Sequence, residues 1–228
     1  MRVPVASSEP LAAPAHLISP IWLRSALIAG CDPAEMHPDE AAAVSKHWVA
    51  SRRQEFAAGR VCASRGMEAL GMTILPIGIA ADRSPIWPHG TVGSISHSRT
   101  IAAAALARRA SGYQAIGLDI EEVLPLDTEL FQEVCVTEEL AWLERQPAPR
   151  RGLLAKAIFC VKEAAYKGQY PISQRLFGFH ALRVTLDLGS LRFCARFLED
   201  ASPFAAGDRL NGWIWISNHH FVAMVALR

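Results

Sequence analysis

Two acidic residues stand two apart in the sequence GLDIE, positions 117–121, which is the spacing of neighbours on one face of a β-strand. In such a strand Leu118 and Ile120 would pack inward, while Asp119 and Glu121 would stand side by side on the outer face. Two adjacent carboxylates repel each other unless a cation lies between them, and oxygen ligands of this kind suit Mg²⁺. The pattern therefore predicts either a metal site or, more simply, the solvent-facing end of an ordinary strand.

A second set of charged residues lies in the segment 153–167, whose apolar residues recur at helical spacing. The face of this helix opposite the apolar one would carry Lys156, Glu163 and Lys167. Glu163 and Lys167 are four residues apart, the favourable orientation for an ion pair on a helix surface. The pair is therefore either a solvated salt bridge or a functional pair, in which Glu163 joins the metal site and Lys167 reaches a phosphate. Gly168 is predicted to end the helix.

Candidate anion-binding residues precede both segments. The sequence SISHS at 94–98 surrounds His97 with small hydroxyl groups, a setting that suits either an anion or a structurally satisfied histidine. It is no nucleophile elbow, because the pattern GxSxG is absent there. Upstream, Arg53 and Arg60 would lie on or beside the buried stripe of a helix, where a long arginine side chain needs an anion or a carboxylate to meet.

The composition is that of a folded chain with almost no net charge. Of 228 residues, 51% are hydrophobic, and 23 basic residues nearly balance 22 acidic ones, which argues against disorder and against a dedicated nucleic-acid binder. No uninterrupted apolar run is long enough to span a membrane, and the proline-broken N-terminal segment is a poor signal peptide. Five scattered cysteines without a CxxC pair predict free thiols in a reducing compartment, so we expect a cytoplasmic protein.

The charges are nevertheless unevenly distributed along the chain. Four arginines lie within residues 52–65, whereas residues 119–144 hold nine carboxylates and no lysine or arginine. These two strips predict either oppositely charged solvated faces, or a phosphate-rich ligand at one strip and a metal at the other.

The elements that would position these residues belong to an α+β fold of two similar-sized halves, joined near residues 111–114. Both halves contain helices and strands, without a regular βαβ alternation, and the first 37 residues are proline-rich and irregular. The periodicity predicts helices at 38–70 (closed by Gly71), 128–134, 138–145 (with Thr137 as N-cap) and 153–167, and strands at 74–80, 92–96, 101–107, 114–120, 182–186, 191–197, 213–217 and 221–226.

Taken in order, three blocks resemble the 4′-phosphopantetheinyl transferases, and within them the large, two-subdomain, enterobactin-synthase-activating branch. GLDIE matches the family pattern G-[IV]-D-[IV]-E, FCVKEAAYK matches [WF]-x-x-K-E-[AS]-x-x-K, and SISHS matches [NS]-[IL]-[ST]-H-[ST]. Two softer blocks, RRQEFAAGRVCA and DRSPIWPHGTVGSISHS, fit the same branch. The resemblance spans residues 52–167, about half the chain, and it is specific because three individually weak blocks occur in order and at the right spacing.

The resemblance implies a fold and a division of labour. The fold would consist of two pseudo-symmetric α/β subdomains, 1–113 on the coenzyme A phosphate and nucleotide side and 114–228 with the metal and catalytic motifs, and the active site would lie at their interface. The implied catalytic residues are Glu163, Lys167 and Asp119; the implied metal ligands are Asp119, Glu121 and Glu163; and the implied coenzyme A contacts are Arg53, Arg60, Arg83, Ser96, His97 and Lys167. Lys162 lies in the same motif, and we expect a structural role for it.

The implied reaction transfers the 4′-phosphopantetheine group of coenzyme A to a serine of an apo carrier protein of a fatty-acid, polyketide or nonribosomal peptide synthase. Adenosine 3′,5′-bisphosphate leaves, and Mg²⁺, or else Mn²⁺, assists. The chain would act as a monomer, since one chain supplies both halves. Leu176, Phe177 and Phe179 are candidates for carrier docking, although the phenylalanines fit a core equally well.

Two departures and two competing functions remain open at this point. Phe159 replaces the tryptophan of many relatives, and arginines stand where many members use lysines, so the adenine-side contacts are not assigned. A non-catalytic coenzyme A binder would have lost the acidic pair or the Lys-Glu pair, and both are intact. An unrelated Mg²⁺-dependent phosphohydrolase would need a nucleophile or a denser carboxylate cluster.

Overall fold

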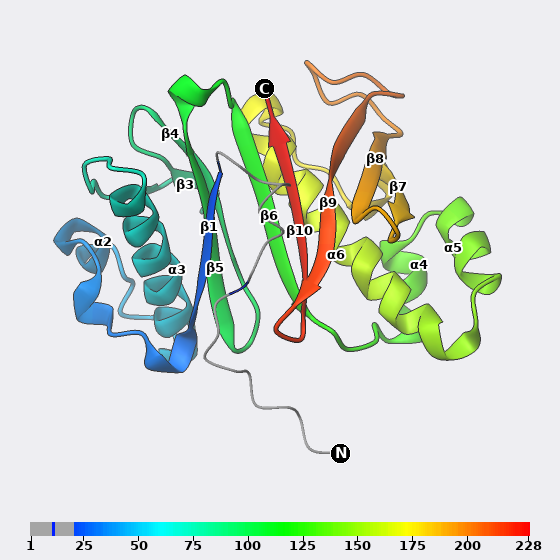
Figure 1. Cartoon of the computed structure of the whole chain (residues 1–228), viewed down its shortest axis with the longest axis horizontal. Coiled ribbons are helices and arrows are strands. Elements are labelled where there is room, and N and C mark those ends of the chain that lie inside the picture. Colours follow the sequence, from blue (N-terminus) through cyan, green and yellow to red (C-terminus); the bar gives the residue numbers. More distant parts are fainter. Residues whose placement is uncertain (1–10, 12–20) are drawn as a thin grey trace. The chain divides into compact units, whose positions relative to one another are not determined.

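The computed structural model describes residue 11 and residues 21–228, and it divides into two compact units, Met1–Gln114 (unit 1) and Ala115–Arg228 (unit 2). Each unit contains helices and antiparallel strands, so the α+β class is confirmed (Figure 1). The division falls one residue from the predicted boundary. The predicted place of the active site, between the two halves, stays a prediction.

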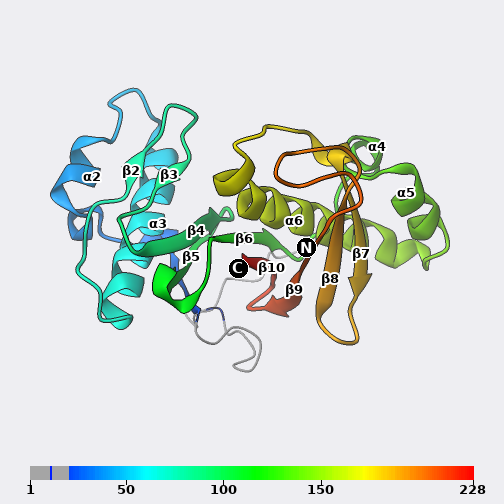
Figure 2. The same cartoon turned by 90° about the horizontal axis from the view of Figure 1, so that it is seen from above.

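Unit 1 is a three-stranded antiparallel sheet with a long helix on one face. The strand order is β1 (Trp22–Leu27), β5 (Ile101–Arg108), β4 (Thr91–His97), and α3 (Ala50–Ala69) packs against the sheet (Figure 2). Alanines at positions 102–105 are fully buried and let the helix approach β5 closely. The smaller elements are η1 (Ile28–Gly30), η2 (Pro33–Glu35), α2 (Pro38–Ala42), β2 (Gly78–Ile79), β3 (Pro85–Ile86) and η3 (Arg109–Ser111).

Three predictions for unit 1 were wrong in detail. Strand β1 lies within the segment expected to be irregular, because its residues form an edge strand whose burial does not alternate. The predicted helix 38–70 is interrupted at residues 43–49, where Ser45 Oγ accepts a hydrogen bond from the amide of His47. The predicted strand 74–80 shrinks to β2. By contrast Gly71, with φ of 61°, follows the end of α3 as expected for a glycine C-cap.

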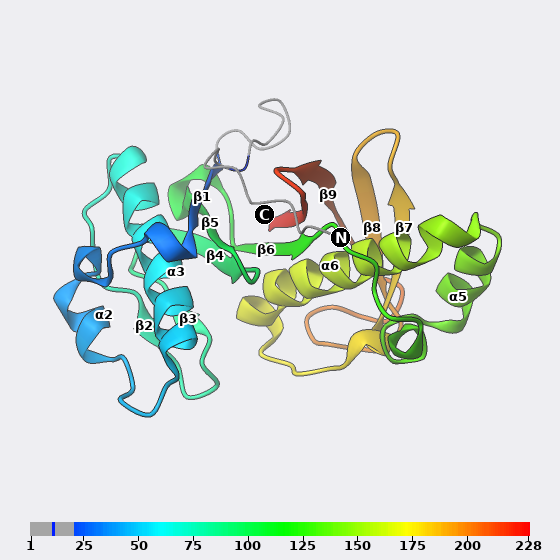
Figure 3. The same cartoon turned by 90° about the horizontal axis from the view of Figure 1, so that it is seen from below.

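Unit 2 is a five-stranded antiparallel sheet crossed on one face by the longest helix. The strand order is β6 (Ala115–Glu122), β10 (His220–Leu227), β9 (Arg209–Ser217), β8 (Arg192–Phe197), β7 (Leu182–Asp187), and α6 (Ala148–Ser173) packs on β6 and β10 (Figure 3). The core between helix and sheet contains Ile158, Val161, Phe193 and Ile214. The shorter elements are η4 (Thr128–Leu130), α4 (Phe131–Val134), α5 (Thr137–Glu144) and η5 (Phe179–Ala181).

Helix α6 is longer than predicted and does not end at Gly168. The helix begins at Ala148 and continues to Ser173, with Gly168 buried inside it. A Cβ atom added at Gly117 of β6 would collide with the carbonyl oxygen of Ala164 and the amide nitrogen of Gly168. The two glycines therefore permit a backbone-to-backbone approach of α6 and β6. The helix ends at Ser173, and Gln174 is its left-handed C-cap, with φ of 54°.

The start of α5 also differs from the prediction. Thr137 is its first residue and Val136 is the N-cap, whose amide donates to Glu139 Oε2 at 2.8 Å. Glu139, three positions after the N-cap, thus satisfies the N-cap amide, and Thr137 is not the cap that the sequence predicted. Within residue 11 and residues 21–228, none of the helices combines the length and the apolarity that crossing a membrane requires.

Candidate functional site

The two carboxylates of GLDIE point toward α6, not outward as predicted. Asp119 is only 4% exposed, and Leu118 and Ile120 on the other face of β6 are fully buried as well. The reason is the close approach of α6 at Gly117, which brings the helix down on the face that a two-residue alternation would assign to solvent. The alternative of an ordinary solvent-facing strand end is therefore wrong.

Two lysines of α6 meet the two carboxylates of β6. Lys167 Nζ donates to Asp119 Oδ1 at 2.6 Å, and Lys156 Nζ donates to Glu121 Oε2 at 3.1 Å. The lysines are eleven residues apart, three turns of helix, so they line one face of α6 and meet two residues of one face of β6. Sequence reasoning placed Lys156 on the polar face of the helix but gave it no role, although it stands seven residues before Glu163 on that face.

The electrostatics confirm that the charged groups are neighbours. Burial raises the pKa of Glu163, with Lys167 opposing and Asp119 and Glu121 adding to the rise. The pKa of Glu121 is likewise raised by burial and by Asp119, against the effect of Lys156. Burial lowers the pKa of Lys167, but Asp119 and Glu163 outweigh it, so that pKa is raised and the ammonium keeps its proton. The pKa of Glu163 thus responds to both other carboxylates, and the pKa of Glu121 responds to Asp119.

These carboxylates are close, yet they are not gathered into a preformed three-ligand cage. Across residue 11 and residues 21–228, no group of three or more His, Cys, Asp or Glu side chains has an arrangement that could hold a metal ion. Oxygen-only donors from one strand and one facing helix do fit Mg²⁺, which takes one or two carboxylates and fills its remaining positions with water and substrate phosphates. The predicted ligand set of Asp119, Glu121 and Glu163 stays a prediction.

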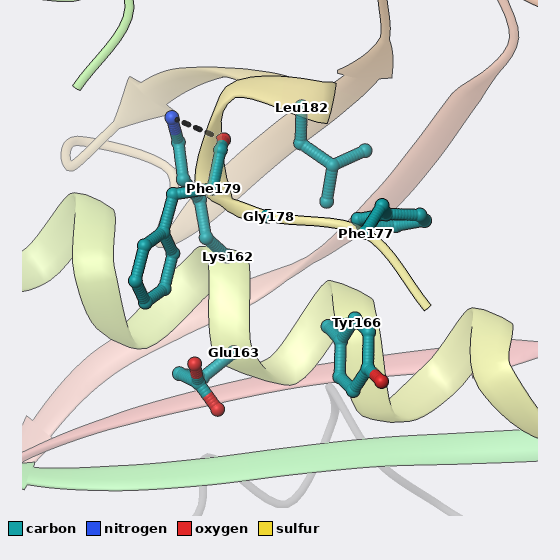
Figure 4. A pocket seen from close by; sticks show the side chains of 7 residues that line it. All are labelled: Lys162, Glu163, Tyr166, Phe177, Gly178, Phe179 and Leu182. Atoms are coloured by element: carbon teal, nitrogen blue, oxygen red, sulfur yellow. Dashed lines mark hydrogen bonds between the residues drawn. The ribbon is translucent and has the colours of Figure 1, made fainter. Parts of the chain in front are cut away.

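A small cavity of about 150 Å³ lies beside Glu163 (Figure 4). Its wall opposite α6 is the segment 177–179, and Tyr166 of the helix meets Phe177 edge to face, with ring centroids 5.4 Å apart. The other lining residues are Lys162, Gly178, Phe179 and Leu182. The cavity is therefore mostly apolar, with one carboxylate whose pKa is raised at its edge.

The docking candidates after α6 divide between core and surface. Phe177 and Phe179 are partly buried against the main core of unit 2, which is the simpler of their two predicted roles. Leu176 is 69% exposed and precedes the cavity wall directly. Of the three candidates, Leu176 is thus the most exposed.

Lys162 has structural contacts of the kind expected for it. Its side chain is 1% exposed, and its ammonium donates to Val134 O, Glu139 Oε2 and Phe179 O, the last of which is drawn in Figure 4. All three N–H groups of the ammonium are therefore engaged, and the lysine ties α6 to α5 and to the cavity wall.

In unit 1, His97 ends strand β4 and contacts an arginine that sequence reasoning passed over. Arg52 Nη1 lies 2.8 Å from His97 Nε2, and Glu55 Oε2 lies 3.2 Å from the same arginine nitrogen and 3.7 Å from the histidine. Because a guanidinium only donates, Nε2 of the imidazole is the acceptor in this contact. Ser96 beside it is buried, at 4% exposure.

The three predicted arginines occupy other surroundings. Arg53 lines a separate apolar cavity of about 460 Å³, together with Pro33, Ala34, Met36, Ala41, Val44, Ala50 and Gln54. Arg60 is 5% exposed, and its Cζ lies 4.7 Å from the centroid of the Phe56 ring. Burial lowers the pKa of Arg60, and Glu40 opposes that shift. The buried Nη1 of Arg60 has no hydrogen-bond partner. Arg83 is exposed in the turn between β2 and β3, with φ of 72°. The signal that distinguishes Arg52 from Arg53 is helix phase, since adjacent residues diverge by about 100°.

Comparison with known proteins agrees with these two units. Residues 39–107 match the 4′-phosphopantetheinyl transferase N-terminal domain, and residues 115–214 match the 4′-phosphopantetheinyl transferase superfamily. The first match falls in unit 1, and the second begins at the first residue of unit 2. The chain is thus a transferase of the two-part type.

Individual relatives extend the comparison. The chain is 31% identical over 175 residues to 4′-phosphopantetheinyl transferase Npt of Nocardia iowensis, covering 73% of this chain and 77% of the relative. It is 32% identical over 172 residues to 4′-phosphopantetheinyl transferase PptT of Mycobacterium tuberculosis, covering 74% of each. It is 37% identical over 124 residues to enterobactin synthase component D of Escherichia coli, covering 54% of this chain and 57% of the relative.

The chain therefore belongs to the 4′-phosphopantetheinyl transferase family, with enterobactin synthase component D among its relatives. Its activity is the transfer of phosphopantetheine from coenzyme A to carrier proteins. The two competing functions, a non-catalytic binder and an unrelated phosphohydrolase, find no support in these comparisons.

Proposed function

We propose that transfer takes place on the facing surfaces of β6 and α6, with Asp119, Glu163 and Lys167 as the reacting set. The observation that supports this assignment most directly is the 2.6 Å contact between Lys167 Nζ and Asp119 Oδ1, next to a carboxyl group whose pKa is raised. In the reaction the serine hydroxyl oxygen of the carrier bonds to the β-phosphorus of coenzyme A. The bond from that phosphorus to the bridging oxygen breaks, adenosine 3′,5′-bisphosphate leaves, and the serine proton goes to a base or to solvent.

Asp119 and Glu121, with Glu163 as the third group, would hold Mg²⁺ or Mn²⁺. The oxygen-only donor set supports this assignment, as does the pKa of Glu163, which Asp119 and Glu121 both raise. When bound, the dication would neutralise charge on the pyrophosphate and on the leaving group. The three carboxylates would fix the position of the dication. When no metal is bound, the two lysines of α6 would balance the negative charge of the carboxylates.

Lys167 would place a positive charge at the phosphate that is transferred. Its raised pKa keeps the ammonium protonated near neutral pH, and its hydrogen bond to Asp119 holds the group in place before substrate arrives. Charge that is already positioned costs no reorganisation during transfer, which is the main protein contribution to phosphoryl-type reactions.

Glu163 has two candidate roles. Its position beside Asp119 and Glu121 suits a metal ligand, whereas its raised pKa and its place at the edge of the cavity suit a base that accepts the serine proton, directly or through a water. The cavity beside it would take the apolar part of the pantetheine arm, because it is lined mainly by aromatic and aliphatic side chains.

The residues of unit 1 would bind the 3′-phosphate and nearby phosphates of coenzyme A. His97, Ser96 and Arg60 stay in this assignment, and the 2.8 Å contact with His97 adds Arg52 to it. Arg53 and Arg83 stay predictions that rest on the family resemblance alone. The guanidinium of Arg52 and the imidazole offer charge-assisted donors to an anion once the histidine is protonated.

The acceptor would be an apo carrier protein of a fatty-acid, polyketide or nonribosomal peptide synthase, approaching at Leu176. The relation to enterobactin synthase component D supports the nonribosomal peptide type. We further propose that the chain acts as a monomer, and that it works in the cytoplasm, where its five free thiols would stay reduced.

The test is incubation of the full chain with coenzyme A, Mg²⁺ and apo carrier, followed by the intact mass of the carrier. We expect the carrier to gain one phosphopantetheine, with the modification on a serine. Asp119→Ala should abolish transfer while the circular dichroism spectrum is unchanged, and Glu163→Gln should lower turnover strongly. Unchanged turnover in the Asp119 variant would overturn the metal assignment, and unchanged turnover in the Glu163 variant would overturn both roles of that residue.

A further inference from the structure

Lys156 is a charged residue of the site that the family motif does not include. It stands three residues before Phe159, where the matching block begins, and its ammonium nitrogen Nζ lies over that ring, 5.2 Å from the centroid. Its ammonium donates to Glu121 Oε2 at 3.1 Å, and the two side chains are only 18% and 25% exposed. The contact is thus half-buried and directed at one of the proposed metal ligands.

We propose that Lys156 is the resident counter-charge of Glu121, which a divalent ion has to displace, so that this lysine weakens the binding of free metal. The inference rests on the proposed function, because it takes Glu121 as a metal ligand. Lys156 would hold the acidic face of β6 neutral when no metal is bound, and it would raise the metal concentration at which the site fills.

The argument is one of competition for a single carboxylate. An ammonium in hydrogen-bond contact with Glu121 neutralises the charge that attracts a dication, and it repels a dication bound a few ångströms away. Lysine can yield this position, because its long, flexible stem lets the ammonium leave Glu121 and the Phe159 ring and turn toward solvent. Removing the charge should therefore tighten metal binding, roughly tenfold for two charges a few ångströms apart at a partly exposed site.

Lys167 differs from Lys156 in its surroundings. Its ammonium donates to Asp119, its pKa is raised by both Asp119 and Glu163, and it belongs to the family motif. Lys156 has Glu121 as its hydrogen-bonding partner and an aromatic ring beneath it. The structure thus separates a lysine suited to the transferred phosphate from one suited to setting metal affinity.

The test is a titration of the metal-stripped full chain with Mn²⁺, without coenzyme A, in which free Mn²⁺ is measured by electron paramagnetic resonance. Lys156→Met should bind Mn²⁺ roughly tenfold more tightly than the parent chain, while Lys156→Arg, which keeps the charge, should stay within about twofold. Unchanged or weaker binding by Lys156→Met overturns the proposal. Circular dichroism of each variant shows whether it is folded.

Two further variants show whether tighter Mn²⁺ binding by Lys156→Met arises from its contact with Glu121. Arg209→Met removes one positive charge from the exposed surface of β9 in the same unit and should leave Mn²⁺ affinity unchanged; equal tightening there would show a net-charge effect and overturn the proposal. In a Glu121→Gln background, Lys156→Met should tighten Mn²⁺ binding clearly less than tenfold, because the carboxylate for which lysine and metal compete is gone and only the direct repulsion remains. If Glu121→Gln leaves Mn²⁺ affinity intact, the metal assignment fails and takes this inference with it. If Glu121→Gln weakens binding but Lys156→Met never tightens it, this inference fails alone.

Discussion

The buried ion pair of Lys162 and Glu139 gives the sharpest test of how unit 2 is held together. The two side chains are 1% and 2% exposed, and Nζ lies 2.7 Å from Oε2. Glu139 also accepts the amides of Val136 and Val184, while Lys162 also donates to two backbone carbonyls. One pair of side chains therefore joins α6 to the start of α5, to the edge strand β7 and to the cavity wall.

Removing one partner leaves the other as a buried charge without compensation. Burial already lowers the pKa of Lys162, and Glu139 opposes that shift, so the ammonium depends on this carboxylate. We expect Lys162→Met and Glu139→Gln each to lower the free energy of unfolding by about 3–5 kcal/mol. The double variant should cost at least about 2 kcal/mol less than the sum of the two, because neither charge is then stranded.

The assay is urea unfolding of the full chain, followed by tryptophan fluorescence and far-ultraviolet circular dichroism. The matched control is the neighbouring pair of Arg183 and Glu138, 3.4 Å apart with side chains 34% and 60% exposed, where Glu138→Gln should cost less than about 1 kcal/mol. The reasoning is refuted if the Lys162 and Glu139 variants are as mild as this control. Strict additivity of the two single changes would refute it as well.

Three other changes test the packing, the phosphate site and the docking surface. Gly117→Ala should cost about 3 kcal/mol or more in urea unfolding, since its Cβ would strike the backbone of α6, whereas Gly30→Ala, with open space around it, should be mild. Arg52→Met should weaken the binding of adenosine 3′,5′-bisphosphate roughly tenfold by calorimetry, and equal loss in Arg53→Met would contradict our distinction between the two. Leu176→Asp should raise the KM for the carrier roughly fivefold and leave coenzyme A affinity unchanged; an unaltered KM would exclude docking there.

Much of unit 2 could be predicted because its sequence is locally regular. The strands 182–186 and 191–197 alternate between apolar and polar residues, and the structure places β7 and β8 there within a residue or two. Strand β1 has no such alternation, and its existence depends on pairing with β5, which is far away in the chain. The prediction that Gly168 ends the helix was wrong because the role of this glycine also depends on a distant strand. A glycine that ends a helix and a glycine that lets a helix contact a strand look alike in sequence.

The motif residues of the site could be named from the sequence, but their partners could not. The direction of Asp119 depends on α6, which begins almost 30 residues later, so no local pattern reveals that its face of the strand is covered. The arginine beside His97 was missed by one position, since a single residue turns a helix by about 100° and the sequence does not show which face meets β4. The spacing of the motifs thus identified the helices and strands that contact one another. Which side-chain atoms make those contacts depends on tertiary packing.

The charges gathered between β6 and α6 suggest why lysines and carboxylates come together there. Three carboxylates and two ammonium groups, all ionised, leave one net negative charge, which would repel a coenzyme A pyrophosphate. On the proposed assignment a dication reverses that sign and makes the same surface attractive to the substrate. Without Lys156 and Lys167 the carboxylates would repel one another when no metal is bound, and the raised pKa values of Glu121 and Glu163 would rise further. The two lysines would therefore keep the acids ionised and ready for the metal, and the position of Lys156 on Glu121 would set how readily the metal enters.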